Sequence, residues 1–262
     1  MSGVRLMLGD CLERMKEIES GTVDLILADL PYGTTQNKWD SVVPLDTLWA
    51  EYLRVAKPTA AFVFTASQPF TAALVMSNPK LFKHEWVWIK NRGSNFANTV
   101  REPMKEHESV LVFSRGKWTY NKQMQERTGG GASRAQYGFE HATKTSNYGA
   151  FSGRSSGAIQ ELRVPSSWQK FNCEVGLHPT QKPVALMEYL IRTYAVPGMT
   201  VLDNTMGSGT TGVAALRCGC DFIGIELDPT HFETASARID DEAVRLATPV
   251  PQFDLFAEVA NV

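Results

Sequence analysis

The sequence has few cysteines and no pattern that is typical of a metal site. Its four cysteines, Cys11, Cys173, Cys218 and Cys220, show no C-x-x-C spacing and have no histidine pair nearby. Such spacing is typical of structural zinc sites and redox-active thiols, and disulfide frameworks are typical of small secreted domains. We therefore expect free thiols in a reducing compartment, and no metal ion.

Long apolar runs and a leader segment are also missing. No stretch of about 18 apolar residues exists, so no membrane span is expected. The amino terminus lacks the basic and then apolar layout of a secretion signal, and there is no internal repeat. With 43% hydrophobic and 21% charged residues, the 262 residues have an ordinary globular composition that can bury a large core. We expect a cytoplasmic protein with one large domain, or with a domain and an insertion.

The net charge is only −2, yet the charges are unevenly distributed. Residues 83–182 carry 15 Lys and Arg against 8 Asp and Glu, a balance of +7, and the remainder carries 11 against 20, a balance of −9. A basic middle between acidic flanks fits a chain whose core binds a small ligand and whose middle contacts phosphates. A solvated loop region would carry the same charges.

Hydrophobic periodicity predicts an α/β order of elements. Strands are expected over residues 5–8, 23–28, 60–65, 82–90, 109–114, 200–203 and 222–226. Helices are expected after Asp10, over 45–55, from Pro69, from Pro183, over 210–218, and over a last segment that contains residues 232–246. The strand over 109–114 is expected to be antiparallel to its neighbour. Residues 127–160 contain seven glycines and no lasting period, which is typical of a functional loop or a disordered segment.

The most informative stretch is residues 22–33, TVDLILADLPYG. Its apolar run predicts a strand that is buried on both faces of a parallel sheet and ends at Asp29-Leu30-Pro31-Tyr32. Ligands of open α/β sheets bind at the carboxyl ends of such strands. The Asp29 carboxylate and the Leu30 carbonyl can hold the hydrogens of a base amino group, and Tyr32 offers a ring for stacking. The same residue types also form ordinary turns after strands.

A second motif follows the strand at 200–203. Residues 207–212 read GSGTTG, a G-x-G-x-x-G pattern that by itself indicates a dinucleotide site only weakly. Three residues separate the glycines from Asp203, whose carboxylate would repel a pyrophosphate but suits a cationic amino acid group. Glu226 ends the next strand, where it can bind both ribose hydroxyls. A ribose with a cationic amino acid end describes S-adenosylmethionine; a tight turn without a ligand is the alternative.

A third motif lies between these two. Residues 178–183 read HPTQKP and stand just before a helix. Polar side chains and free amides at a helix start can receive a carboxylate. Alone, this hexapeptide predicts no more than a capping turn with a structural His178.

In this order, the three motifs resemble those of the amino-methyltransferases that act on DNA bases, in particular the permuted group called beta class. The resemblance covers residue 5 to about residue 229 apart from the poorly patterned insertion. It implies a Rossmann-like, doubly wound, mostly parallel seven-stranded α/β sheet (a permuted class I methyltransferase) with a target-recognition insertion. The implied parts are a catalytic half over 1–115, the insertion over 116–176, a cofactor-binding half over 177–248 and a tail over 249–262.

The resemblance also implies site residues and partners. The catalytic tetrad is Asp29, Leu30, Pro31 and Tyr32, with leucine where proline is usual, so the Leu30 carbonyl is less firmly oriented. The residues implied to contact S-adenosylmethionine are Asp10, Cys11, Asp29, Thr180, Lys182, Asp203, Thr205, Gly207, Ser208, Gly209, Thr210, Thr211 and Glu226. The candidate contacts to double-stranded DNA are Arg92, Arg101, Lys105, Lys117, Lys122, Arg127 and Arg134. The resemblance allows a homodimer and a cognate restriction nuclease, in a bacterial or phage restriction-modification setting.

The expected reaction is methyl transfer to the N6 amino group of an adenine that is flipped out of duplex DNA. Adenine is favoured over the N4 amino group of cytosine because the tetrad begins with Asp rather than Ser. Carbon-5 methylation of cytosine is disfavoured because no cysteine follows a proline. Two other classes stay open. A dinucleotide-dependent oxidoreductase would use the glycine motif but leave the tetrad without purpose, and a catalytically silent DNA-binding relative is compatible with Leu30.

Overall fold

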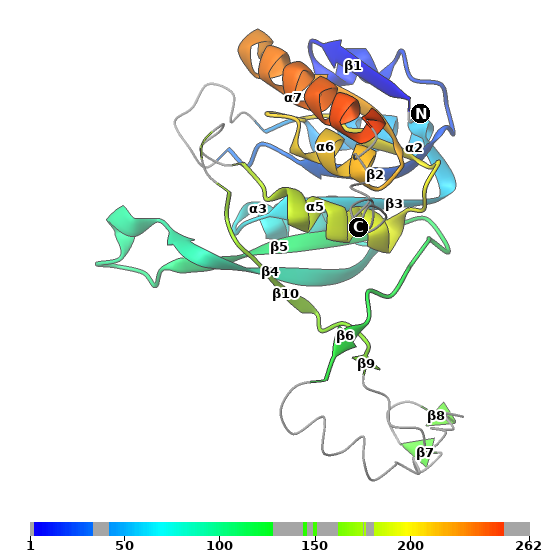
Figure 1. Ribbon diagram of the computed structural model, residues 1–262. Coiled ribbons are helices and arrows are strands. Elements are labelled where there is room, and N and C mark those ends of the chain that lie inside the picture. Colours follow the sequence, from blue (N-terminus) through cyan, green and yellow to red (C-terminus); the bar gives the residue numbers. More distant parts are fainter. Residues whose placement is uncertain are drawn as a thin grey trace, which may run out of the picture.

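A single sheet with helices on both faces forms the centre of the computed structural model (Figure 1). The residues it describes are 3–33, 42–127, 162–174, 176 and 181–248, with the backbone alone of 144–145 and 149–150. In order across the sheet, the strands are β1 (Val4–Leu8), β12 (Asp221–Glu226), β11 (Thr200–Asp203), β2 (Val23–Asp29), β3 (Ala56–Ala66), β5 (Lys105–Ser114), β4 (Phe82–Ser94) and β10 (Trp168–Phe171). The helices are α1 (Cys11–Met15), α2 (Leu45–Val55), α3 (Phe70–Ser77), α5 (Val184–Tyr194), α6 (Thr210–Arg217) and α7 (Pro229–Ala247). The α/β fold expected from the sequence is confirmed.

Most neighbouring strands of the sheet run parallel. Only β5 is antiparallel to its two neighbours, β3 and β4, which confirms the direction expected for residues 109–114. The sheet has eight strands, one more than the resemblance implies. The additional strand β10 pairs with β4 and comes from the segment 116–176 that is expected to be an insertion. This end of the segment is therefore part of the main sheet. Two short pairs, β6 (Gln125–Glu126) with β9 (Leu162–Arg163) and β7 (Lys144–Thr145) with β8 (Gly149–Ala150), stand outside it.

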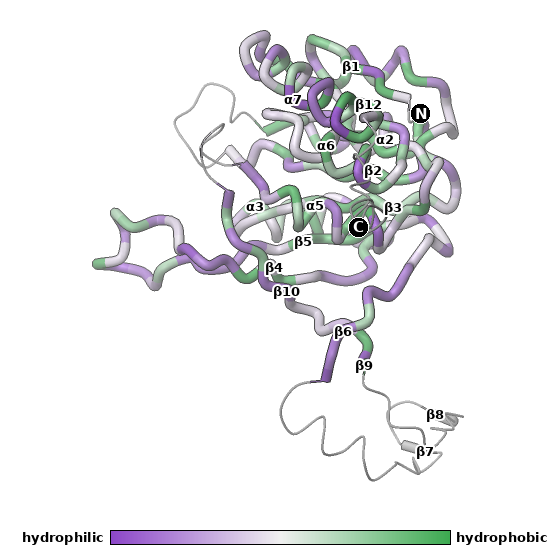
Figure 2. Tube along the Cα trace, in the orientation of Figure 1, coloured by the Kyte–Doolittle hydropathy of each residue, from purple (hydrophilic) through white to green (hydrophobic). Residues whose placement is uncertain are grey.

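Side chains alternate between two cores along the central strands. On β2, Leu25 and Leu27 pack against α5, α6 and α7, whereas Ile26 and Ala28 pack against α1, α2 and α3. All four side chains are fully buried. The nearly continuous apolar run therefore marks a strand that is covered on both faces, as the sequence predicts. Figure 2 shows the hydrophobic residues concentrated in this part of the molecule.

The direction of chain progression reverses between β2 and β11. From β2 the chain continues through α2 to β3 on one side, and from β11 it continues through α6 to β12 on the other. The ladder between the two strands consists of the pairs Val201–Leu25 and Leu202–Ile26. Both strands run on beyond these pairs, β2 as far as Asp29. Ligands of open α/β sheets bind outside the carboxyl ends of the strands at such a reversal.

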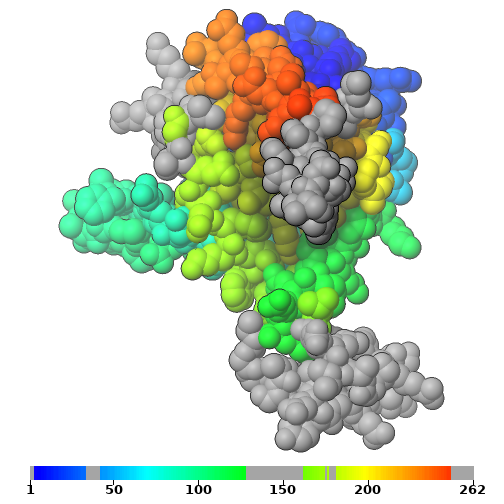
Figure 3. Space-filling view, viewed as in Figure 1, coloured from blue at the N-terminus to red at the C-terminus, as the bar shows by residue number. Residues whose placement is uncertain are grey.

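A hairpin projects from the body where β4 turns into β5, and we call residues 91–105 the arm (Figures 1 and 3). Its turn is built by Asn95, which has a left-handed backbone with φ of 65°. The Asn95 side chain accepts a hydrogen bond from the Lys105 amide at 2.9 Å and donates one to Glu102 at 2.9 Å. This turn holds the ring of Phe96 in solvent, with 80% of the residue exposed.

No helix among the described residues is long and apolar enough to cross a membrane. All four cysteines are free thiols. Within the described ranges, no group of three or more His, Cys, Asp or Glu side chains is placed to hold a metal ion.

Candidate functional site

A cavity of about 1090 Å³ opens at the carboxyl ends of β2 and β11. Asp29 and Asp203 both line it, so the two motifs that are far apart in the sequence share one cavity. The cavity-lining residues among those implied to bind a cofactor are Asp10, Cys11, Asp29, Lys182, Asp203, Thr205, Gly207, Ser208, Thr210, Thr211 and Glu226. Thr180 lies outside the described residues, and Gly209 supports the turn from outside the cavity wall. The volume is sufficient for a nucleoside cofactor together with a second ligand.

The Asp29 carboxylate is held by three side chains. Its Oδ1 accepts hydrogen bonds from the Thr65 hydroxyl and, at 2.8 Å, from the Tyr32 hydroxyl. Its Oδ2 accepts from the Lys182 ammonium at 2.5 Å. A carboxylate offers about four acceptor sites, so one site on Oδ2 is left for a further donor. Asp29 is thus fixed in place and can still accept one hydrogen bond from a ligand.

Lys182 is buried between two carboxylates. Besides Asp29, its ammonium lies 3.5 Å from Oε2 of Glu108, and the other oxygen of Glu108 pairs with Lys90 at 2.7 Å. Burial disfavours the charged ammonium, but Asp29 and Glu108 together outweigh it and raise the pKa of Lys182. Burial likewise opposes ionisation of Glu108, and the two lysines lower its pKa nevertheless. A chain of alternating charges therefore runs from Lys90 on β4 through Glu108 and Lys182 to Asp29.

Tyr32 contacts more of the protein than the sequence suggests. Its ring stacks on Phe70 with centroids 5.2 Å apart, and the Lys182 ammonium lies 5.6 Å from the ring centroid. Its hydroxyl donates to Asp29. In this arrangement Tyr32 orients the carboxylate, and stacking of a ligand on the ring stays a prediction.

Asp203 ends β11 at the floor of the cavity and is almost fully buried. Burial raises its pKa to about 7, although hydrogen bonds from Thr211 and from the Thr205 amide oppose the rise. A carboxylate in such a setting gains from a cationic ligand group, because the cation replaces the water that burial removes. Its position suits the ammonium of an amino acid moiety.

Glu226 ends β12 and closes the glycine turn. Its carboxylate accepts a hydrogen bond from the Gly207 amide at 2.9 Å and one from the Asp228 amide at 2.8 Å. Two of its roughly four acceptor sites are thereby used, and the others can receive a vicinal diol. Asp10, at the end of the neighbouring β1, caps α1 by accepting from the Leu12 amide at 2.8 Å. These two acids mark the part of the cavity that suits a nucleoside.

The glycines of the second motif are needed for different reasons. Gly209 has φ of +79°, which an L side chain rarely adopts, and a Cβ there would lie 3.0 Å from Ala235 of α7. A Cβ on Gly212 would lie 2.5 Å from Ile239 and 2.7 Å from Phe222. The first residue makes the turn and the other lets α6 approach α7 and β12. The motif therefore serves strand-turn-helix packing as well as ligand access.

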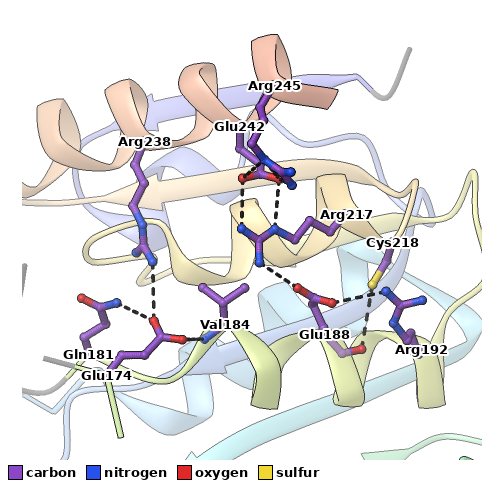
Figure 4. A network of polar contacts seen from close by, with 10 residues as sticks. All are labelled: Glu174, Gln181, Val184, Glu188, Arg192, Arg217, Cys218, Arg238, Glu242 and Arg245. Carbon is purple, nitrogen blue, oxygen red and sulfur yellow. Dashed lines mark hydrogen bonds and ion pairs between the residues drawn. The ribbon is translucent and has the colours of Figure 1, made fainter. Parts of the chain in front are cut away.

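Arg238 of α7 links the glycine turn to the segment before α5, and Figure 4 shows its ion pair with Glu174 and the hydrogen bonds of Glu174. Arg238 of α7 donates to the Ser208 carbonyl at 3.1 Å and lies 3.9 Å from the Glu174 carboxylate. Glu174 in turn accepts from Gln181 at 3.0 Å and from the Val184 amide at 2.9 Å. The residues that flank the HPTQKP motif are thus fixed relative to the glycine turn.

The structure divides the candidate DNA contacts into two groups. Arg92 and Lys105 line the cavity mouth, and Arg101 stands on the same arm. Lys117 and Lys122 follow Ser114, which pairs with Ala61, four residues along β3 from the Thr65 that pairs with Asp29 and away from the carboxyl end of that strand. Arg127 ends a described range, and Arg134 lies outside the described residues.

Several residues of the site were not identified from the sequence. Thr65, Glu108 and Lys90 contact the charged centre, and Asn204 accepts from the buried Tyr52 hydroxyl at 2.6 Å. For Thr65 a signal was available, because it ends the strand next to β2. Glu108 precedes an apolar run in the segment KEHES, where the sequence alone does not distinguish it from the exposed Glu106.

Comparison with known proteins assigns the sequence to a family. The family model described as DNA methylase matches residues 23–237. The chain is 26% identical over 245 residues to the Type II methyltransferase M1.MboII of Moraxella bovis, covering 87% of this chain and 93% of that protein. It is 28% identical over 246 residues to the DNA adenine methyltransferase YhdJ of Escherichia coli (strain K12), covering 88% and 81%.

Solved structures show the same fold. The complex of M1.HpyAVI with SAM superposes with a TM-score of 0.60 at 23% identity, covering 90% of this chain and 98% of that chain. The cytosine-N4-specific PvuII DNA methyltransferase superposes with a TM-score of 0.63 at 14% identity, covering 94% and 93%. At these identities the likeness concerns the fold, and it does not distinguish the target base.

Proposed function

The chain belongs to the DNA methylase family, and from that premise we propose that it transfers a methyl group from S-adenosylmethionine to the N6 amino group of adenine in duplex DNA. The observation that carries this proposal is the shared cavity, into which the Asp29 turn and the Asp203 turn both open. One turn offers acceptors for an amine, and the other offers a carboxylate for a cationic amino acid group.

The methyl donor lies along the carboxyl ends of β1, β12 and β11. Glu226 receives the ribose hydroxyls, Asp203 receives the ammonium of the methionine moiety, and Asp10 and Cys11 line the adenine end. Lys182 already pairs with Asp29 at 2.5 Å, so its expected contact with the donor's carboxylate requires sharing of the ammonium. The donor supplies an electrophilic methyl group on a sulfonium.

The target adenine occupies the part of the cavity beside Tyr32 after it leaves the duplex. One hydrogen of its amino group bonds to the remaining acceptor site of Asp29 and the other to the Leu30 carbonyl. These bonds favour a tetrahedral geometry at the amino nitrogen, which takes its lone pair out of conjugation with the ring and directs it toward the sulfonium. The nitrogen then forms its bond to the methyl carbon as the carbon–sulfur bond breaks, and the amino group gives up a proton to the Asp29 carboxylate. Positioning and electrostatic complementarity supply most of the acceleration.

The duplex lies against the arm and the cavity mouth. Arg92, Arg101 and Lys105 contact its phosphates there, which places the bound strand beside Asp29. The segment 116–176, apart from β10, serves target recognition between a catalytic half and a cofactor-binding half. A homodimer and a nuclease partner belong to this proposal as well.

Replacement of Asp29 tests the proposal. We expect Asp29→Ala to lower methyl transfer from labelled S-adenosylmethionine to unmethylated DNA on the order of a hundred- to a thousandfold, because an oriented acceptor is lost. Cofactor binding by calorimetry should change little. Asp29→Asn, which keeps the shape of the side chain, is the matched variant and should be nearly as inactive. Full turnover in either variant would contradict the role given to Asp29.

The choice of base is tested on the product. Nucleoside mass spectrometry of the methylated DNA should show N6-methyladenine. N4-methylcytosine instead would keep the mechanism and correct the substrate, and binding of a nicotinamide cofactor in place of S-adenosylmethionine would favour the oxidoreductase.

A further inference from the structure

Thr205 makes a contact that a cofactor-binding role does not explain. Its hydroxyl donates a hydrogen bond at 3.0 Å to the backbone carbonyl of Asp29. This bond joins the glycine turn directly to the catalytic turn. It lies beyond the end of the ladder between β11 and β2, whose last pair is Leu202–Ile26. It therefore closes the two strands at the point where they part to form the cavity.

The bond holds the peptide unit that precedes Leu30, the residue whose carbonyl is proposed to hold the target amine. The Asp29 carbonyl belongs to the peptide unit before Leu30, and the Leu30 carbonyl belongs to the unit after it. Two rotations at Leu30 relate these units. Pro31 restricts the second rotation, ψ, because a residue before proline is kept in the extended region. The first rotation, φ, has no covalent restriction at a leucine, whereas a proline would fix it near −65°.

Two contacts supply the missing restriction. The Leu30 side chain is buried, with 3% exposed, in the core formed with α1, α2 and α3. Thr205 holds the peptide unit on the amino side of Leu30. With its side chain and its preceding peptide unit both fixed, Leu30 has one available φ, and its carbonyl has one direction.

We infer that Thr205 is a positioning residue for methyl transfer, which sets the Leu30 carbonyl and the spacing of the two turns in place of a proline at position 30. The inference rests on the proposed function. The Thr205 amide also donates a hydrogen bond to Asp203 at 3.1 Å. Thr205 therefore connects Asp203, which is proposed to bind the methyl donor, with the Asp29 turn, which is proposed to bind the target base. In-line transfer needs the reacting atoms about 3–3.5 Å apart, and a shift of 1 Å can cost on the order of a hundredfold in rate.

The test compares two substitutions at position 205. Thr205→Val keeps the shape and removes the donor, and Thr205→Ser keeps the donor. With unmethylated DNA and labelled S-adenosylmethionine at saturation, we expect the single-turnover rate to fall about ten- to a hundredfold in Thr205→Val and to stay within about threefold in Thr205→Ser. Cofactor affinity by calorimetry should change by less than about threefold in both. Thr234→Val, which removes a hydroxyl bonded within α7, is the control and should leave the rate unchanged.

A substitution at position 30 tests whether Thr205 acts in place of a proline there. In a Leu30→Pro background, Thr205→Val should cost less than about threefold, because proline now fixes φ. An equal cost in both backgrounds would overturn the inference, and so would equal rates for Thr205→Val and Thr205→Ser, or a loss seen only in cofactor affinity. If Leu30→Pro does not fold, the serine and valine variants alone decide the question. If the unaltered chain methylates no DNA, both the proposed function and the role of Thr205 are overturned. If the unaltered chain is active and one of the contradicting results is obtained, only the role of Thr205 is overturned.

Discussion

A single buried carboxylate makes the ligand site sensitive to pH. Burial raises the pKa of Asp203 to about 7, so the ligand-free protein holds a proton there over part of the neutral range. A cationic ligand group requires the ionised form, and binding therefore releases that proton below the pKa. The stability of the folded state depends on pH in the opposite direction. A raised carboxyl pKa favours the folded state most at low pH, and that contribution is lost as the pH rises from the unfolded value, 3.8, through about 7.

We expect the affinity for S-adenosylmethionine to increase several-fold between about pH 6 and pH 7.5, at most about tenfold per pH unit. Over the same range the free energy of unfolding of the ligand-free chain should decrease. Calorimetry and chemical denaturation at a series of pH values measure the two effects. Asp203→Asn, which cannot titrate, should bind the cofactor weakly and with a flat pH dependence over this range. A dependence that persists in this variant would assign it to another group.

The arm is the element whose surface is least explained by folding. Phe96, Val100 and Met104 are 80%, 87% and 41% exposed, and Figure 2 shows hydrophobic positions alternating with hydrophilic ones at the end of the arm. Asn95 and Asn98, on either side of Phe96, line the cavity mouth. A basic hairpin that holds an aromatic ring at this place suits insertion between base pairs, where the ring fills the space that the target base leaves.

We expect Phe96→Ala to lower the rate of methyl transfer on fully paired DNA on the order of tenfold. The ring would no longer fill the space left by the target base, so nothing would offset the free energy of unstacking that base. On a duplex whose target base faces an abasic site, the loss should be much smaller, since pairing no longer opposes extrusion. Rates on the two substrates, once the methylated site is mapped, provide the measurement. Met76→Ala removes another exposed apolar side chain, 71% exposed, from the end of α3 and should affect the rate on neither substrate. An equal loss on both substrates, or a change of oligomeric state in Phe96→Ala, would indicate another role for the arm.

Elements were predictable from the sequence where their signal is local. The apolar runs of β2 and β3 and the cap of α1 at Asp10 depend on nearby residues, and the structure confirms them. The start of β5 at Lys105 and the strand β10 were not predicted, because their pairing partners, Ser94 and Val87–Lys90, lie elsewhere in the chain. The partners of Asp29 follow the same rule. The sequence predicted Asp29 at the end of a strand. Its contacts with Thr65 and Lys182 were not predicted, because they depend on the order of the strands in the sheet.

The charge distribution of the whole molecule separates two kinds of ligand. The basic middle, residues 83–182, forms β4, the arm, β5 and β10, whereas the acidic remainder carries Asp203 and Glu226. A sulfonium donor and a polyanionic acceptor thus approach parts of opposite charge. Phosphate contacts release counterions, so binding that depends on them weakens with salt, by a log–log slope of about −0.9 for each contact.

We expect kcat/KM for DNA to fall steeply with salt, and cofactor affinity to change little. The candidate DNA contacts lie in two different places, so two variants can be compared. A variant with Arg92, Arg101 and Lys105 replaced by Gln should lose about three units of the log–log slope, because all three stand at the cavity mouth or on the arm. The matched variant, with Lys117→Gln and Lys122→Gln, changes charges in the segment that follows β5 and should keep the slope of the unaltered chain. Equal losses in the two variants would show that the duplex also covers this segment, and a flat salt response would exclude phosphate anchoring altogether.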